Sequence, residues 1–182
     1  GSVSKETGWI SQHILLFEEG NSLIGILPNY LKNHSWGEYI FDQVFANAWE
    51  NAGGKYYPKL LSAIPFSPVA GERFLIKKGY SRKFVIEKLL DALEDLKKFY
   101  KVSSAHINFI NEPQLKIALK NKFWFERNNI QFHWSNQNYE NFEHFLSKLS
   151  SSKRKTIRRE RKEIHKSSVL IDIVKNDEIK NY

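Results

Sequence analysis

Two carboxylates, an imidazole and several aromatic rings crowd into one short stretch of the chain, at His34, Trp36, Glu38, Tyr39 and Asp42. A carboxylate beside an amine can remove a proton from it once burial raises the pKa of the acid. Glu38 and Asp42 are therefore the candidate catalytic residues. Trp36 or Tyr39 can stack on a sugar or a base, and His34 joins the candidate substrate-binding set. The alternative is a packed connection in which Asp42 only caps the next helix.

A second group of candidates flanks the third predicted strand. Tyr56, Tyr57 and Lys59 stand at its start, and Phe66 and Arg73 follow it. Ligands of open α/β sheets commonly bind in loops beyond the carboxyl ends of strands, so all five are candidate substrate-binding residues. Lys59 and Arg73 can pair with a phosphate or a carboxylate, Arg73 in bidentate fashion. The alternative is a proline-stiffened loop with its charges in solvent.

A third candidate region is a basic run between Ser150 and Lys166. It holds eight basic and two acidic residues, which accounts for +6 of the net charge of +8. One interpretation is a solvated linker helix. The other is an anion-binding helix for a tRNA backbone, a nucleotide-linked phosphate or a peripheral anionic membrane surface. Its candidate anion-binding residues are Lys153, Arg154, Arg158, Arg161 and Lys162.

Several kinds of site are not indicated. The chain has no cysteine, which excludes disulfides and thiolate zinc sites. It has no dinucleotide fingerprint, Walker loop, H-E-x-x-H or G-x-S-x-G motif. No histidine has a partner at metal-ligand spacing, so no metal site is predicted. No apolar run approaches the ~18 residues of a membrane span and no signal peptide is recognisable, so we expect no transmembrane segment and a cytoplasmic protein.

Periodicity and turn residues predict an alternation of strands and helices. Strands are predicted at 13–17, 23–27, 60–66, 105–110, 123–127, 130–134 and 169–174, with hairpins joining the first pair and the pair around Asn128. Helices are predicted at 42–52, 81–100, 111–122 and 141–149, followed by the basic helix capped by Ser151 or Ser152. This order predicts an α/β (α+β) fold around a twisted mixed sheet.

The motifs together resemble the Fem-like proteins of the acetyltransferase superfamily, a family connected with peptidoglycan biosynthesis or recognition. The resemblance rests on GEYIFD at 37–42, AWENAG at 48–53, YYPKL at 56–60, PFSPV at 65–69 with Gly71 and Arg73, and KRKTIRRER at 153–161. It implies a two-domain protein about twice as long. Each domain would have an acetyltransferase-type (GNAT) fold, with a mostly antiparallel twisted sheet flanked by helices.

On this resemblance, residues 1–140 form an N-terminal domain that lacks its first elements. Residues 141–166 form a helical basic segment between domains, and residues 167–182 begin a truncated second domain. Gly1-Ser2 is then expected to be native, with a short segment before it.

The resemblance also implies a reaction. Fem relatives pass an amino acid from aminoacyl-tRNA to an amine of a peptidoglycan precursor, so the implied activity is acyl or aminoacyl transfer to an amine. The donor is acetyl-CoA or aminoacyl-tRNA, and no other cofactor is predicted. The loop with Gly71, Arg73 and Gly79 lacks the spacing that binds CoA pyrophosphate in this fold, so this half is not expected to hold CoA in the usual way. The alternative is a non-catalytic module that binds the precursor or RNA.

Overall fold

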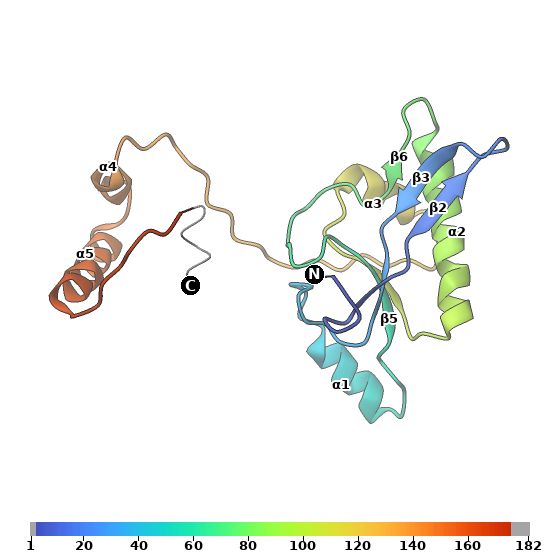
Figure 1. Cartoon of the computed structure of the whole chain (residues 1–182), viewed down its shortest axis with the longest axis horizontal. Helices are drawn as coiled ribbons and strands as arrows, with labels where there is room; N and C mark the ends of the chain where they lie inside the picture. The colour runs from blue at the N-terminus through green and yellow to red at the C-terminus, as the bar shows by residue number, and fades with distance from the viewer. Residues whose placement is uncertain (1–2, 176–182) are drawn as a thin grey trace. The chain divides into compact units, whose positions relative to one another are not determined.

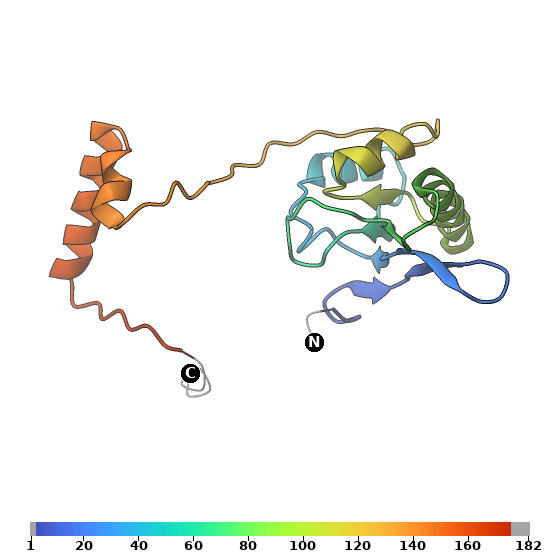
Figure 2. The same cartoon turned by 90° about the horizontal axis from the view of Figure 1, so that it is seen from above.

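The computed structural model describes residues 3–175 (Figures 1 and 2). The chain divides into two compact units, Gly1–Asn128 and Asn129–Tyr182. The domain boundaries predicted from the sequence stay a prediction. The pair Gly1-Ser2 and the last seven residues of the predicted second domain, 176–182, lie outside the described residues.

The first unit contains seven strands and three helices within its described residues. The strands are β1 (Trp9–Ser11), β2 (Ile14–Phe17), β3 (Leu23–Leu27), β4 (Tyr30–Lys32), β5 (Lys59–Ser62), β6 (Leu75–Ile76) and β7 (Ala105–Ile107). The helices are α1 (Gln43–Asn51), α2 (Arg82–Tyr100) and α3 (Glu112–Ala118).

One bent hairpin supplies strands to both sheets of this unit. Trp9 pairs with Lys32 in β1 and β4, and Ile14 pairs with Leu27 in β2 and β3. Both pairs belong to the same antiparallel register, because each pair of residue numbers has the same sum. Pro28 interrupts the ladder between them, since proline has no N–H to donate. The hairpin bends there, and its two halves enter different sheets.

The two sheets have the orders β1-β4-β5-β7 and β2-β3-β6. All neighbouring strands are antiparallel except β5 and β7, which α2 connects in parallel. The predicted mixed α/β class with a mostly antiparallel arrangement is thus confirmed. The acetyltransferase-specific arrangement remains a prediction.

The main core lies between α2 and the strands. Figure 1 shows α2 running beside β2 and β3, which it contacts. Val85, Leu89 and Leu93 of α2 are fully buried and pack with Leu27 and Leu60 of the strands. Ser81 caps α2 by accepting from the Phe84 N–H. Asn111 caps α3 in the same way, as predicted from its position before that helix.

Strand β5 is buried on both faces. Leu60 faces the main core, whereas Leu61 packs with Trp9, Tyr30 and Ala63 in a second, smaller core. Because side chains alternate along a strand, Lys59 shares the face of Leu61. The alternation therefore buries Lys59 beside the second core instead of exposing it to solvent.

The prediction of a second hairpin and of a final strand is wrong. Residues 123–127 and 130–134 form no hairpin, and residues 169–174 form no strand. The apolar alternation is present, but Phe125 and Phe132 are almost fully exposed. A strand is stabilised by cross-strand partners and a buried face. Within the described residues these segments have no cross-strand partner, and Trp124 alone among their side chains packs against the main core. The sequence also missed β1, β4 and β6, each of only two or three residues.

Helix α1 differs from its predicted packing. The pattern of Val44, Phe45 and Trp49 predicts a buried apolar stripe. In the structure these three side chains are exposed, and Ala46 is the buried residue of the helix. Asp42 precedes the helix as predicted, but its carboxylate makes no capping hydrogen bond because it is engaged elsewhere.

The second unit is a pair of helices, α4 (Phe142–Ser147) and α5 (Ser151–Lys166). Ser150 caps α5 by accepting from the Lys153 N–H, so the predicted cap at Ser151 or Ser152 is one or two residues too late. The rings of Trp134, Tyr139 and Phe145 pack together beside α4.

Candidate functional site

A row of side chains across three strands builds the centre of the site. The antiparallel registers pair Trp9 of β1 with Lys32 of β4, and Lys32 with Lys59 of β5. All three side chains are fully buried. Like charges directly opposite each other on a sheet are destabilising, and buried lysines are rare unless paired. Such a pair therefore needs compensation from nearby groups.

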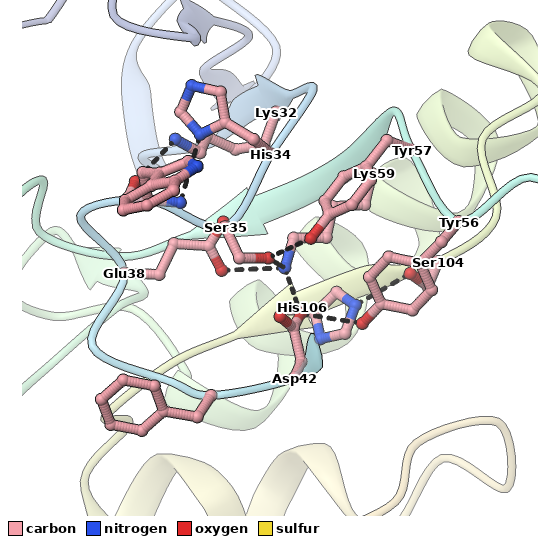
Figure 3. Close-up of polar contacts among 12 residues, drawn as sticks. Lys32, His34, Ser35, Glu38, Asp42, Tyr56, Tyr57, Lys59, Ser104 and His106 are labelled. Carbon is pink, nitrogen blue, oxygen red and sulfur yellow. Dashed lines mark hydrogen bonds and ion pairs between the residues drawn. The ribbon is translucent and has the colours of Figure 1, made fainter. Parts of the chain in front are cut away.

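Lys59 receives that compensation from two buried carboxylates (Figure 3). Its Nζ lies 2.8 Å from Glu38 Oε2 and 2.5 Å from Asp42 Oδ2. Nζ also donates to Ser35 Oγ at 2.8 Å. The ammonium thus has three oxygen partners, which fills its donor capacity. Lys59 was predicted to pair with a phosphate or carboxylate of a ligand, whereas in the structure its ammonium is paired with two carboxylates of the chain itself.

Three hydroxyl groups surround this ion cluster. The Tyr56 hydroxyl donates to Asp42 Oδ2 at 2.8 Å. The Tyr57 hydroxyl and Ser35 Oγ share a hydrogen bond of 2.7 Å. Tyr56 is buried, whereas Ser35 and Tyr57 are only partly buried. Ser35 and Tyr57 are therefore the two hydroxyl-bearing residues of the cluster that are partly exposed.

Lys32 is held differently from Lys59. Its Nζ donates to the Trp36 carbonyl at 3.1 Å and lies 3.9 Å from the centre of the Trp9 ring. Burial lowers the pKa of Lys32 to about 8; Glu38 opposes this shift and Lys59 adds to it. Lys32 thereby ties the loop between β4 and α1 to the sheet.

We expect the pKa of Lys32 to appear in the pH dependence of stability. The folded chain releases this proton near pH 8, whereas the unfolded chain keeps it to about 10.5. Between those values the unfolded state binds more protons, so the free energy of unfolding rises with pH. Urea unfolding between about pH 8 and pH 10 should therefore show a smaller rise for Lys32→Met than for the wild type. Lys55→Met, at an exposed lysine, should keep the wild-type rise; equal rises in all three proteins would contradict this account.

Glu38 and Asp42 differ in pKa although they share Lys59. Burial is the largest influence on Glu38 and raises its pKa against the opposing effect of Lys59. Burial also acts to raise the pKa of Asp42, but hydrogen bonds from Lys59 and Tyr56 outweigh it and leave that pKa below its usual value. Carboxylates whose pKa values are pushed apart are typical of acid–base sites. Glu38 is the one suited to carry a proton, and Asp42 is the permanent counter-ion.

Each carboxylate also keeps one oxygen without a protein partner. Glu38 Oε1 and Asp42 Oδ1 are buried and accept no hydrogen bond within residues 3–175. A buried acceptor without a donor is costly, by about 1–3 kcal/mol. These two oxygens are the unsatisfied acceptors of the cluster.

The loop over the cluster depends on a glycine. Gly37 has a φ of +78°, and a Cβ there would lie 2.6 Å from the Phe66 ring. The Gly37 carbonyl accepts from the Phe66 N–H at 3.2 Å. Phe66, a predicted substrate-binding residue, thus packs on this loop and on the Trp9 ring. The same loop leaves the Trp36 side chain 79% exposed.

Gly37→Ala is expected to destabilise the first unit by about 1–3 kcal/mol, because it adds left-handed strain and a clash with Phe66. Thermal unfolding would measure the loss. Gly71→Ala is the matched control, since a Cβ there would contact the Arg73 side chain at an ordinary 3.5 Å. A loss no larger in Gly37→Ala than in the control would contradict the packing described.

Two histidines lie near the cluster, with different roles. His34 Nδ1 accepts the Trp36 N–H at 3.1 Å, and the ring packs on Gly8, where a Cβ would lie 2.2 Å from Nε2. His34 therefore shapes the loop. His106 of β7 bonds Ser104 Oγ through Nε2 at 2.8 Å (Figure 3). Burial, with the charge of Lys59, lowers the pKa of His106 to about 4, so its imidazole is neutral at pH 7.

A protein-family model described as FemAB-like, peptidoglycan biosynthesis/recognition, matches residues 1–182 of the chain. The chain belongs to the FemAB-like family. Searches of curated proteins and of solved structures found no match. Among the described residues of this FemAB-like chain, no group of three histidine or acidic side chains is placed to hold a metal ion. No helix there is long and apolar enough to cross a membrane.

Arg73 of this FemAB-like chain lies apart from the ion cluster. It is buried, and its guanidinium donates to the carbonyls of Asn108, Glu72 and Val69. Its backbone N–H donates to Gln114 Oε1 at 2.8 Å. The side chain joins the loop before β6 to the end of β7, so all three guanidinium nitrogens are engaged with the protein.

The predicted site residues fall into three groups. Glu38, Asp42, Tyr56 and Lys59 meet directly, and Tyr57 joins them through Ser35. His34 and Trp36 lie in the loop between β4 and α1, and Phe66 contacts that loop. Arg73 lies outside the ion cluster within the first unit, and the predicted anion-binding residues belong to α5 of the second unit.

Sequence reasoning missed Trp9, Lys32, Ser35 and His106. Lys32 had a usable signal, because extending the register of the predicted hairpin past Pro28 pairs it with Trp9. Ser35 and His106 had no comparable signal. A serine in a loop and a histidine in a strand can be assigned to the cluster only once their neighbours in space are known.

Proposed function

We propose that this site transfers an acyl or aminoacyl group to an amine of a peptidoglycan precursor. Membership of the FemAB-like family supports the substrate class. The observation that carries the reaction is the state of Glu38. It is a buried carboxyl with a raised pKa, one oxygen on Lys59 and the other without a protein donor among the described residues.

In the proposed reaction Glu38 acts as general base and then as general acid. The acceptor nitrogen attacks the acyl carbonyl carbon, a C–N bond forms, and Glu38 Oε1 takes the proton that the nitrogen loses. The bond from the acyl carbon to the donor oxygen or sulfur then breaks, and Glu38 returns the proton to the leaving group. Proton transfer of this kind contributes about 10²–10⁴ in rate.

The neighbours of Glu38 would position the reactants. Lys59, itself paired with Asp42, holds the carboxyl in place. The hydroxyls of the partly exposed Ser35 and Tyr57 would donate to the carbonyl oxygen as it gains charge. The exposed Trp36 ring can stack on a sugar of the acceptor. The donor in this proposal is acetyl-CoA or aminoacyl-tRNA, and the setting is the cytoplasm.

The binding part of the proposal can be tested by thermal unfolding with three ligands: acetyl-CoA, aminoacyl-tRNA and a nucleotide-linked peptidoglycan precursor. A ligand of the native state at a hundredfold excess over its Kd adds about 2.7 kcal/mol of stability. We expect the precursor and one donor to raise Tm. Trp36→Ala should reduce the shift caused by the precursor without changing the Tm of the free protein, because this ring is mostly exposed. No shift with any ligand would contradict the proposal.

A further inference from the structure

The basic residues of α5 divide into two faces according to their contacts. Arg158 forms an ion pair with Glu143 of α4, and the Arg161 guanidinium lies 4.4 Å from the centre of the Phe142 ring. Arg154 donates to the Ser147 carbonyl at 3.4 Å. These three arginines contact α4. They were predicted to bind anions, but their guanidinium groups already have partners within the second unit.

A second set of basic residues occupies a neighbouring face of α5, about 100° around the helix axis from the three arginines. Lys155, Arg159, Lys162 and Lys166 follow the spacing i, i+4, i+7 and i+11. At 100° per residue they fall within about 60° of one another, and they span about 17 Å along the axis. All four are exposed. We call this set the basic stripe.

Little opposes the positive charge of the stripe. Within the described part of the chain, Lys155, Lys162 and Lys166 have no ion pair. Arg159 has an exposed one to Glu163 at 3.9 Å, and an exposed pair of this kind contributes little. Four like charges on one face repel each other unless an anion lies beside them.

We propose that the basic stripe binds the phosphate backbone of a double-helical nucleic acid. About five phosphates of one strand lie along the same length of duplex axis, at 3.4 Å per phosphate. The four cations are thus spread along a line of comparable charge density. This proposal is independent of the acyl-transfer proposal, because it rests only on the second unit.

The composition of the stripe favours nucleic acid over a membrane. A helix that lies in a bilayer interface buries an apolar face beside its basic residues. The sizeable apolar residues of α5, Ile157 and Ile164, lie roughly opposite the stripe by the same helical geometry. The stripe itself presents no apolar side chain that could insert among lipids.

The test compares two double variants of the whole chain with equal change of charge. Lys155→Glu with Lys162→Glu alters the stripe. Lys122→Glu with Lys148→Glu alters two exposed lysines that lie off the stripe. Anisotropy titrations would use labelled duplex RNA and duplex DNA over a range of salt concentrations, with phosphatidylserine vesicles as a third probe. Circular dichroism would confirm that both variants keep their helices.

We expect the stripe variant to bind duplex about tenfold more weakly and to lose about 2 from the slope of log K against log salt. The control variant should stay close to the wild type. The duplex that the wild type binds with higher affinity shows whether RNA or DNA supplies the phosphates. An equal loss in both variants would show that net charge, not the stripe, drives binding and would overturn the proposal. Binding to vesicles but to neither duplex would overturn it too.

Discussion

Replacing Lys59 by methionine is expected to destabilise the first unit by about 3–5 kcal/mol, because it leaves two buried carboxylates without their cation. The side chain is fully buried, and its ammonium contacts Glu38, Asp42 and Ser35. Urea unfolding at neutral pH would measure the loss. The stability of the variant should recover partly in acid, since without Lys59 the folded state gains by protonating both carboxyls.

A second substitution separates lost charge from lost packing. Lys59→Met combined with Asp42→Asn should be more stable than Lys59→Met alone, because one uncompensated charge is gone. Lys55→Met is the control at an exposed lysine, and we expect a change within about 0.5 kcal/mol there. If Lys59→Met cost no more than this control, the buried ion cluster could not be a structural centre of the unit.

The second large effect is expected on catalysis. Glu38→Gln keeps the shape of the side chain and removes its ability to take a proton, so kcat for acyl transfer should fall by about 10²–10⁴. KM for the acceptor should change much less, because the partly exposed Ser35, Trp36 and Tyr57 remain in place. Steady-state kinetics with varied acceptor would separate the two constants.

The matched control for this prediction is Glu50→Gln, an exposed glutamate on α1. It should leave both constants unchanged. A pH profile adds a readout that a structural role would not move: wild-type activity should fall on acidification with an apparent pKa above that of an ordinary glutamate, in line with the raised pKa of Glu38. An unchanged kcat in Glu38→Gln would remove Glu38 from the reaction.

The helices with strong local signals could be predicted from the sequence. Ser81 and Asn111 each stand before an apolar period of 3.6, and each caps its helix in the structure. Such signals are local, because a cap and a buried stripe lie within one segment of the chain. The short strands β1 and β4 carry no comparable signal, since three residues are too few to show a period.

Sequence reasoning selected part of the ion cluster but missed Lys32 and Ser35, and it did not give the arrangement of the side chains. Glu38, Asp42, Tyr56, Tyr57 and Lys59 were selected by residue type and position, and the structure joins them. The sequence placed Lys59 in a loop that binds external anions, because a charged side chain usually faces solvent. Its burial follows from the pairing of β4 with β5, which is a long-range contact.

The most direct test of the proposed reaction is the mass of the acceptor. The chain would be incubated with donor and a nucleotide-linked peptidoglycan precursor, and the precursor would then be analysed by mass spectrometry. We predict that its mass increases by one acyl group, that the group is attached through an amide, and that Glu38→Gln slows its appearance. A precursor that raises the Tm of the protein but keeps its mass with either donor would contradict acyl transfer and identify a binding module.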